Sequence, residues 1–168
     1  MRAGGGKNKG SSYERWVCGK LSLWVTGGKI EDGLWRSAMS GGRATVHLKR
    51  GTKIQQVGDI CAVRPELHDF CAKFYIECKH VKSLDIESFL IRGKGLLAKF
   101  WKTACQEAKS HDRIPLIVAR QNRTHDLLIS PLMLKGLYSE RVVSVRAPRM
   151  SPCTVRPLAE VLLNPYQE

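Results

Sequence analysis

The stretch FYIECKH, residues Phe74–His80, decides the fold that we expect for this chain. It is rich in residues that favour β-strands, and successive side chains of a strand point to opposite faces of its sheet. The apolar residues at positions 74, 76 and 78 can therefore face a core, while Glu77 and Lys79 emerge with Tyr75 on the other face. This acid and this lysine form either an exposed salt bridge, which is common on strands, or part of a functional site.

A second acid stands in another β-like run upstream. Asp59 lies near the start of residues 58–63, GDICAV, which are otherwise uncharged. Two acids and a lysine on adjacent strands can hold a hard cation and a water molecule beside a phosphate group. The two runs together predict the centre of a metal-dependent nuclease.

The charge of the chain points to a polyanionic partner. Among its 168 residues, 28 Lys and Arg outnumber 15 Asp and Glu, which gives a formal net charge of +13. DNA or RNA is the leading candidate for such a partner, and a basic protein of the ribosomal type is the alternative. The length is sufficient for one domain with a hydrophobic core.

The cysteines and the apolar runs argue against several classes of protein. None of the six cysteines forms a C-x-x-C pair, which argues against a zinc ribbon. Cys61 and Cys78 lie inside apolar runs, so we expect them to be reduced core thiols in a cytosolic setting rather than parts of disulfides. The N-terminus has no signal-peptide pattern. No apolar run reaches the ~20 residues that span a bilayer, so we expect no membrane partner.

Hydrophobic periodicity and turn residues predict an alternation of helices and strands. After a flexible basic arm at residues 1–10, the expected helices are 11–26, 83–91 (capped by Ser83), 96–110 and 158–163. The expected strands are 34–38, 45–49 and 52–56 as a hairpin, 58–63, 73–79, 114–119, 127–129 and 141–146, and residues 147–157 are expected to form a Pro-rich linker.

Glu14, in the first predicted helix, has two interpretations. Residues Ser11 to Glu14 fit a capping box, in which the Glu14 side chain only satisfies a backbone N–H group. Alternatively, Glu14 is a third acid of the metal site, carried on the first helical turn.

The predicted hairpin is strongly basic. A Gly-rich turn before it, at residues 39–43, would let a phosphate approach backbone N–H groups, with Arg43 as a charged partner. The hairpin itself carries Lys49, Arg50 and Lys53 and no acid. It is either a solvated hairpin or an arm that lies in or across a DNA groove.

The order of these elements and acids resembles the PD-(D/E)xK nuclease superfamily. The motif here is Gly58-Asp59 followed by Glu77-Cys78-Lys79, with Gly58 in place of the usual proline. Within that superfamily the chain is most similar to the archaeal-type Holliday junction resolvases, and similar architectures occur in phage-encoded nucleases. Those resolvases carry Glu-Arg on the first helix, Arg-Ser-Ala-x-Ser on the first strand and a late strand that ends in a basic residue. Here the matching segments are Glu14-Arg15, residues 36–40 (RSAMS) and residues 114–120.

The resemblance covers about residues 10–130 and implies the fold. We expect an α/β protein with a restriction-endonuclease-like mixed central sheet, flanked by helices and carrying the basic hairpin as an insertion. Residues 1–10 would be a flexible arm, 11–130 the nuclease domain, and 131–168 a C-terminal extension packed on the same domain.

The resemblance also implies the roles of individual residues. Glu14, Asp59 and Glu77 would be the acids around a Mg²⁺ ion, for which Mn²⁺ could substitute, with the Cys78 backbone carbonyl as a further ligand. Lys79 would be the catalytic cation that orients the attacking water. The DNA-binding residues would be Arg15, Arg36, Ser40, Arg43, Lys49, Arg50, Lys53, Arg120 and Arg123.

The expected function follows from this resemblance. We expect a homodimeric, Mg²⁺-dependent endodeoxyribonuclease that resolves four-way (Holliday) DNA junctions in recombination or repair. It would act in the cytoplasm, or in the host cytoplasm if a phage encodes it. One alternative is a restriction-like or repair endonuclease that cuts duplex or flap DNA, and another is a basic DNA-binding protein without catalytic activity.

Overall fold

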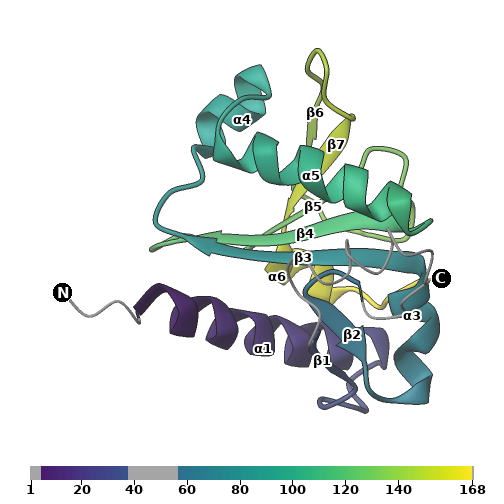
Figure 1. The fold of residues 1–168 in the computed structure, drawn as a ribbon. Coiled ribbons are helices and arrows are strands. Elements are labelled where there is room, and N and C mark those ends of the chain that lie inside the picture. Colours follow the sequence, from purple (N-terminus) through teal and green to yellow (C-terminus); the bar gives the residue numbers. More distant parts are fainter. Residues whose placement is uncertain (1–4, 38–56, 168) are drawn as a thin grey trace.

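A five-stranded mixed sheet forms the centre of the protein. The computed structural model describes residues 5–37 and 57–167. The strands of the sheet are β3 (Phe74–Val81), β4 (Ile114–Gln121), β5 (Leu127–Pro131), β6 (Val143–Val145) and β7 (Cys153–Pro157). Their order is β3-β4-β5-β7-β6, in which β3 and β4 are parallel and the other neighbours antiparallel (Figure 1).

Helices cover both faces of this sheet. The helices α1 (Gly5–Val25), α3 (His68–Lys73) and α6 (Leu158–Leu163) pack on one face, and α4 (Ile86–Arg92) and α5 (Leu96–Ser110) pack on the other (Figure 1). Each face has its own hydrophobic cluster. This arrangement confirms the predicted α/β fold with a mixed central sheet flanked by helices.

The parallel pair β3 and β4 is buried from both sides. The two strands pair in register over eight residues, from Phe74 with Ile114 to Val81 with Gln121. Successive residues of β4 alternate between the two clusters, with Leu116 and Val118 under α1 and Ile117 and Ala119 under α5. A strand buried on both faces needs such a continuous apolar run, which explains why residues 114–119 stood out in the sequence.

A small antiparallel pair extends the α1 side of the molecule. It consists of β1 (Leu34–Arg36) and β2 (Ile60–Ala62); of the residues between them, the structure does not describe 38–56. The predicted hairpin at 45–56 and the Gly-rich turn at 39–43 lie outside the described residues. After β2, a 3₁₀ turn, η1 (Pro65–Leu67), leads into α3 and then β3.

Three local predictions were wrong. α1 begins at Gly5, so Ser11 lies inside the helix and cannot open a capping box, and part of the predicted arm is helical. The N-cap residue of α4 is Asp85 and not Ser83. Asp85 has a left-handed backbone conformation, and its side chain makes no capping hydrogen bond. The predicted linker at 147–157 contains β7, the fourth strand in the spatial order of the sheet.

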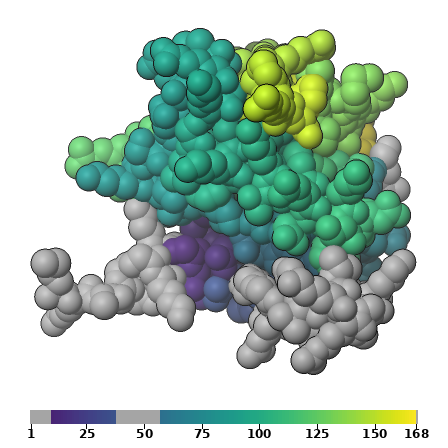
Figure 2. Space-filling view, turned by 45° about the horizontal axis from the view of Figure 1, so that its top comes forward, coloured from purple at the N-terminus to yellow at the C-terminus, as the bar shows by residue number. Residues whose placement is uncertain are grey.

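Residues 131–168 contribute two strands to the central sheet. β6 and β7 belong to the central sheet, and α6 contributes Leu158 and Val161 to the cluster under α1. Residues near 150 also pack beside α4 (Figure 2). Met150 and Ala147 lie beside Gly93, which follows α4. The segment predicted as an extension therefore supplies part of both hydrophobic clusters.

Cys61 and Cys78 are free and buried, as predicted. All six cysteines are free, and all except Cys105 are buried. Among the described residues, no helix has the length and apolarity needed to cross a membrane.

Candidate active site

Backbone hydrogen bonds hold Asp59 against the open edge of β3. Its N–H group donates to the Ile76 carbonyl at 2.8 Å, and its own carbonyl accepts from the Ser37 N–H group at 2.9 Å. Its side-chain Oδ2 accepts a hydrogen bond from the Cys78 N–H group at 2.8 Å. The Asp59 carboxylate is therefore fixed beside the strand that carries Glu77 and Lys79.

Gly58 allows this close approach. Residues other than glycine rarely adopt its backbone φ angle of +78°. A Cβ atom at this position would lie 2.6 Å from the Ile76 carbonyl oxygen. A proline, whose φ is fixed near −65°, could not take this conformation. The geometry explains why Gly58 occupies the position where the superfamily usually has proline.

Lys79 brings the two acids of the edge together. Its ammonium group donates a hydrogen bond to Glu77 Oε2 and lies 3.5 Å from Asp59 Oδ2. The same ammonium group lies 5.6 Å from the centre of the Phe100 ring of α5. The predicted same-face ion pair thus exists, but it is largely buried and shared with Asp59, unlike an exposed surface pair.

Tyr75 fixes the other oxygen of Glu77. The Tyr75 hydroxyl donates to Glu77 Oε1 at 2.7 Å, and the Tyr75 side chain is buried under α5. With Lys79 on Oε2, both oxygens of the Glu77 carboxylate are held. Tyr75 precedes Glu77 by two residues on the same strand face, so its alternation in the sequence could have identified it.

Glu14 lies on α1 and is engaged by Arg36 of β1. The Arg36 guanidinium donates to Glu14 Oε2, and both side chains are partly buried. This pair excludes the capping interpretation of Glu14, because the Glu14 carboxylate bonds a side chain of another element.

Burial, together with the neighbouring acids, raises the pKa of Asp59. Burial raises the pKa of Asp59 to about 6, and the negative charges of Glu77 and Glu14 add to this effect, although Lys79 and the Cys78 N–H group act against it. Burial lowers the pKa of Lys79, but the two neighbouring carboxylates outweigh burial and raise it above its usual value. The site therefore holds more negative charge than it can easily accommodate, which favours a bound cation.

The residues fit a Mg²⁺ site of modest ligand number. Within residues 5–37 and 57–167, no three His, Cys, Asp or Glu side chains are grouped so as to hold a metal ion by themselves. Mg²⁺ usually takes only one or two carboxylates and keeps several waters, so Asp59 and Glu77 suffice. The Cys78 carbonyl points to the same edge of β3 as its N–H group, which bonds Asp59, and is available as a third oxygen.

The other predicted DNA-binding residues are spread over the molecule. Arg15 is exposed on α1, with its guanidinium 3.4 Å from the Ser12 hydroxyl. Arg123 is exposed in the turn after β4. Arg120 is bound by Asp126 through two hydrogen bonds of 2.7 and 2.6 Å. The remaining predicted residues, Ser40, Arg43, Lys49, Arg50 and Lys53, lie outside the described part of the chain.

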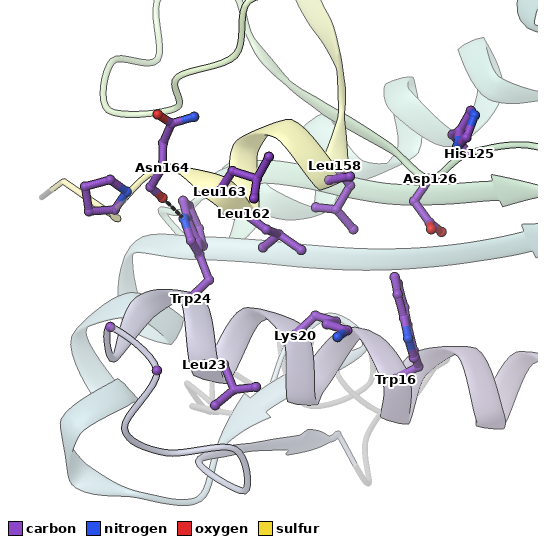
Figure 3. Close-up of a pocket in the computed structure, with 14 residues that line it drawn as sticks. Trp16, Lys20, Leu23, Trp24, His125, Asp126, Leu158, Leu162, Leu163 and Asn164 are labelled. Atoms are coloured by element: carbon purple, nitrogen blue, oxygen red, sulfur yellow. Dashed lines mark hydrogen bonds between the residues drawn. The ribbon is translucent and has the colours of Figure 1, made fainter.

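A separate groove of about 680 Å³ runs between α1 and α6 (Figure 3). Trp16 and Trp24 of α1 and Leu162 of α6 are among its lining residues, and none of the predicted catalytic residues lines it. The groove lies on the side of α1 that packs toward α6, whereas the Glu14 side chain of α1 contacts Arg36 of β1. The groove is therefore not part of the candidate active site.

An acid at the sheet edge beside an E-x-K strand defines the PD-(D/E)xK class of nucleases. A comparison with protein-family models gives a match over residues 5–150 to the family described as Phage putative PDDEXK endonuclease. The chain belongs to this family, which confirms the predicted superfamily and its association with phages. No curated protein and no solved structure matches the chain.

Proposed function

We propose that this protein is a divalent-metal-dependent endodeoxyribonuclease that resolves four-way DNA junctions. The family supports the endonuclease part of this proposal. The observation that carries the choice of active site is the position of the Asp59 carboxylate, which the Cys78 N–H group holds beside Glu77 and Lys79.

Each residue of the centre would have a distinct task. Asp59, Glu77 and the Cys78 carbonyl would hold the cation, Mg²⁺ or Mn²⁺. A cation bound there stabilises negative charge on the phosphate and supplies a nucleophile at neutral pH. Lys79 would orient the attacking water and stabilise developing charge, and Tyr75 would keep the Glu77 carboxylate in place.

Glu14 and Arg36 would act together at the same centre. Arg36 would contact the scissile phosphate, and Glu14 would orient the Arg36 guanidinium and add to the negative charge that attracts the cation. Hydrolysis would release the 3′ oxygen and leave a 5′ phosphate.

Two features support a junction as the substrate. The Glu14-Arg15 pair and the RSAMS stretch at 36–40 are similar to the corresponding segments of junction resolvases. A net charge of +13 suits a substrate that presents several DNA arms. We further propose a two-fold homodimer, because paired nicks in a junction of near two-fold symmetry need two centres related in the same way.

Cleavage of matched synthetic substrates tests this proposal. A four-way junction, a plain duplex and a flap with the same arm sequence would be incubated with the protein in Mg²⁺ or in EDTA. We expect symmetric nicks in the junction, in Mg²⁺ only, and much slower cutting of the duplex. Equal cutting of all three substrates would favour a restriction-like or repair nuclease, and binding without cutting in any divalent metal would favour a non-catalytic DNA-binding protein.

A further inference from the structure

A partly buried polar network attaches α1 to the sheet beside the candidate active site. We propose that Tyr13, Asp126 and Arg120, here called the Tyr13 clamp, are positioning residues that hold Glu14 and its partner Arg36 at the metal centre. This inference rests on the proposed function, because it assigns a role within the same site.

Asp126 is the centre of the clamp. The Tyr13 hydroxyl donates to Asp126 Oδ1 at 2.7 Å, across 113 positions of sequence. Arg120 of β4 donates from Nε to Oδ1 at 2.7 Å and from Nη2 to Oδ2 at 2.6 Å. A bidentate arginine–carboxylate pair fixes orientation as well as distance, so α1, β4 and the start of β5 are locked together here.

Ring contacts reinforce these hydrogen bonds. The Arg120 guanidinium lies 4.9 Å from the Tyr13 ring centre and 4.6 Å from the Trp16 ring centre. The Tyr13 and Trp16 rings lie nearly parallel, with centres 5.9 Å apart. Stacking of a guanidinium on aromatic faces adds stability beyond the salt bridge, so Arg120 binds two successive turns of α1.

Tyr13 of the clamp is adjacent to proposed catalytic residues, both along the chain and in space. Tyr13 precedes Glu14 on α1, and the Tyr13 ring lies 5.1 Å from the ring of His80, which follows Lys79 on β3. Tyr13 is only 3% exposed. A rotation of α1 about its axis would break the clamp and would also move Glu14 relative to Asp59.

The clamp gives Arg120 a role different from the predicted phosphate contact. Asp126 already occupies two of the Arg120 guanidinium nitrogens, and the guanidinium lies over the rings of Tyr13 and Trp16. Burial and the bond to Asp126 raise the pKa of the Tyr13 hydroxyl, so this hydroxyl remains a hydrogen-bond donor.

Manganese binding in a double-mutant cycle tests the proposal. Tyr13→Phe removes the hydroxyl and keeps the buried ring, and Glu14→Gln removes the charge that the clamp is proposed to position. Mn²⁺ affinity would be measured by electron paramagnetic resonance without DNA. We expect Y13F to weaken Mn²⁺ binding about tenfold in the wild-type background and to have no further effect in the E14Q background.

Trp24→Phe is the matched control. Trp24 lies on the same helix, is buried, and donates from Nε1 to the Asn164 carbonyl at 2.7 Å, at the α6 end of the groove (Figure 3). W24F should lower the melting temperature and leave Mn²⁺ affinity unchanged. Asp126→Asn provides a second variant of the clamp if Y13F does not fold.

The outcomes separate the two proposals. The clamp would not be a positioning device if Y13F left Mn²⁺ affinity unchanged, or lowered it equally in the wild-type and E14Q backgrounds. A loss of Mn²⁺ affinity in W24F equal to that in Y13F would overturn the proposal as well. Failure of the wild-type protein to bind Mn²⁺ and to cleave DNA would overturn the proposed function itself.

Discussion

Asp59 is a buried acid that the fold places next to other acids. Burial and the charge of Glu77 raise its pKa to about 6, so ionisation of Asp59 costs more free energy than ionisation of an ordinary Asp. Such conflicts between charge and surroundings are common at functional sites, because the groups are arranged for chemistry and not for stability of the free protein.

The raised pKa of Asp59 predicts a specific pH dependence. The folded protein keeps the proton of Asp59 up to about pH 6, whereas an ordinary Asp releases it near 3.8. The metal-free protein should therefore lose stability as the pH rises between these values, relative to D59N, by about 2 kcal/mol. Thermal melts of both proteins from pH 4 to pH 8 check this. A difference between them that does not change with pH would contradict the raised pKa.

Gly58 allows a second test at the residue scale. Gly58→Ala places a methyl group near the Ile76 carbonyl as well as straining the backbone, so it should displace Asp59. We expect a loss of about 1–3 kcal/mol in stability and a larger loss of cleavage than of DNA binding. Gly28→Ala is the control, because Gly28 also has a positive φ, of +84°, but has no atom within 4 Å of the added group. Equal effects of the two variants on cleavage would reject the role of Gly58.

The site could be predicted from the sequence only in part. The proximity of Asp59, Glu77 and Lys79 could be predicted, because the spacing within two strand-like runs fixes which side chains share an edge or a face. The Tyr13–Asp126 bond joins residues 113 positions apart, and no local pattern shows such a contact. Arg36 was predicted only as a residue that contacts DNA phosphates. Its ion pair with Glu14 could not be predicted, because it depends on how α1 packs beside β1.

Among the elements, β7 was the hardest to predict from the sequence, which indicated a linker at residues 147–157. Pro152 precedes the strand, Pro157 is its last residue, and Arg156 places a charge within it. The structure buries the Arg156 side chain and bonds its guanidinium to the Ser130 hydroxyl at 2.9 Å. Prolines at the ends of a strand and a buried arginine conceal the usual apolar alternation. By contrast, α5 was predicted at both ends, because its apolar stripe is strong and glycines precede it.

The place of β7 predicts that the protein does not tolerate removal of its C-terminal part. A chain that ends at Pro131 lacks β6, β7 and α6, so β5 keeps β4 but loses its other partner, β7, and both clusters lose buried residues. We expect no cooperative thermal transition by circular dichroism. Met133→Ala, at a side chain that is 83% exposed, is the control and should change stability by less than about 0.5 kcal/mol. A cooperative melt of the shortened chain would show that residues 132–168 are dispensable for folding.

At the scale of the whole molecule, the fold places the proposed chemistry at an edge. β3 is an outer strand of the sheet, and Asp59 reaches it from the neighbouring β1–β2 pair. The excess of 13 positive charges favours the approach of a polyanion such as DNA. The family match over residues 5–150 includes every residue of the proposed centre.

The central claim is that Glu77 belongs to a metal centre that hydrolyses DNA, and Glu77→Ala tests it most directly. Junction cleavage in Mg²⁺ and junction binding in EDTA would be measured on the same preparations. Glu140→Ala, which removes an exposed acid, serves as the control. We predict that E77A lowers the cleavage rate by more than about a hundredfold while junction affinity stays at the wild-type level. Cleavage by E77A at the wild-type rate would contradict the account.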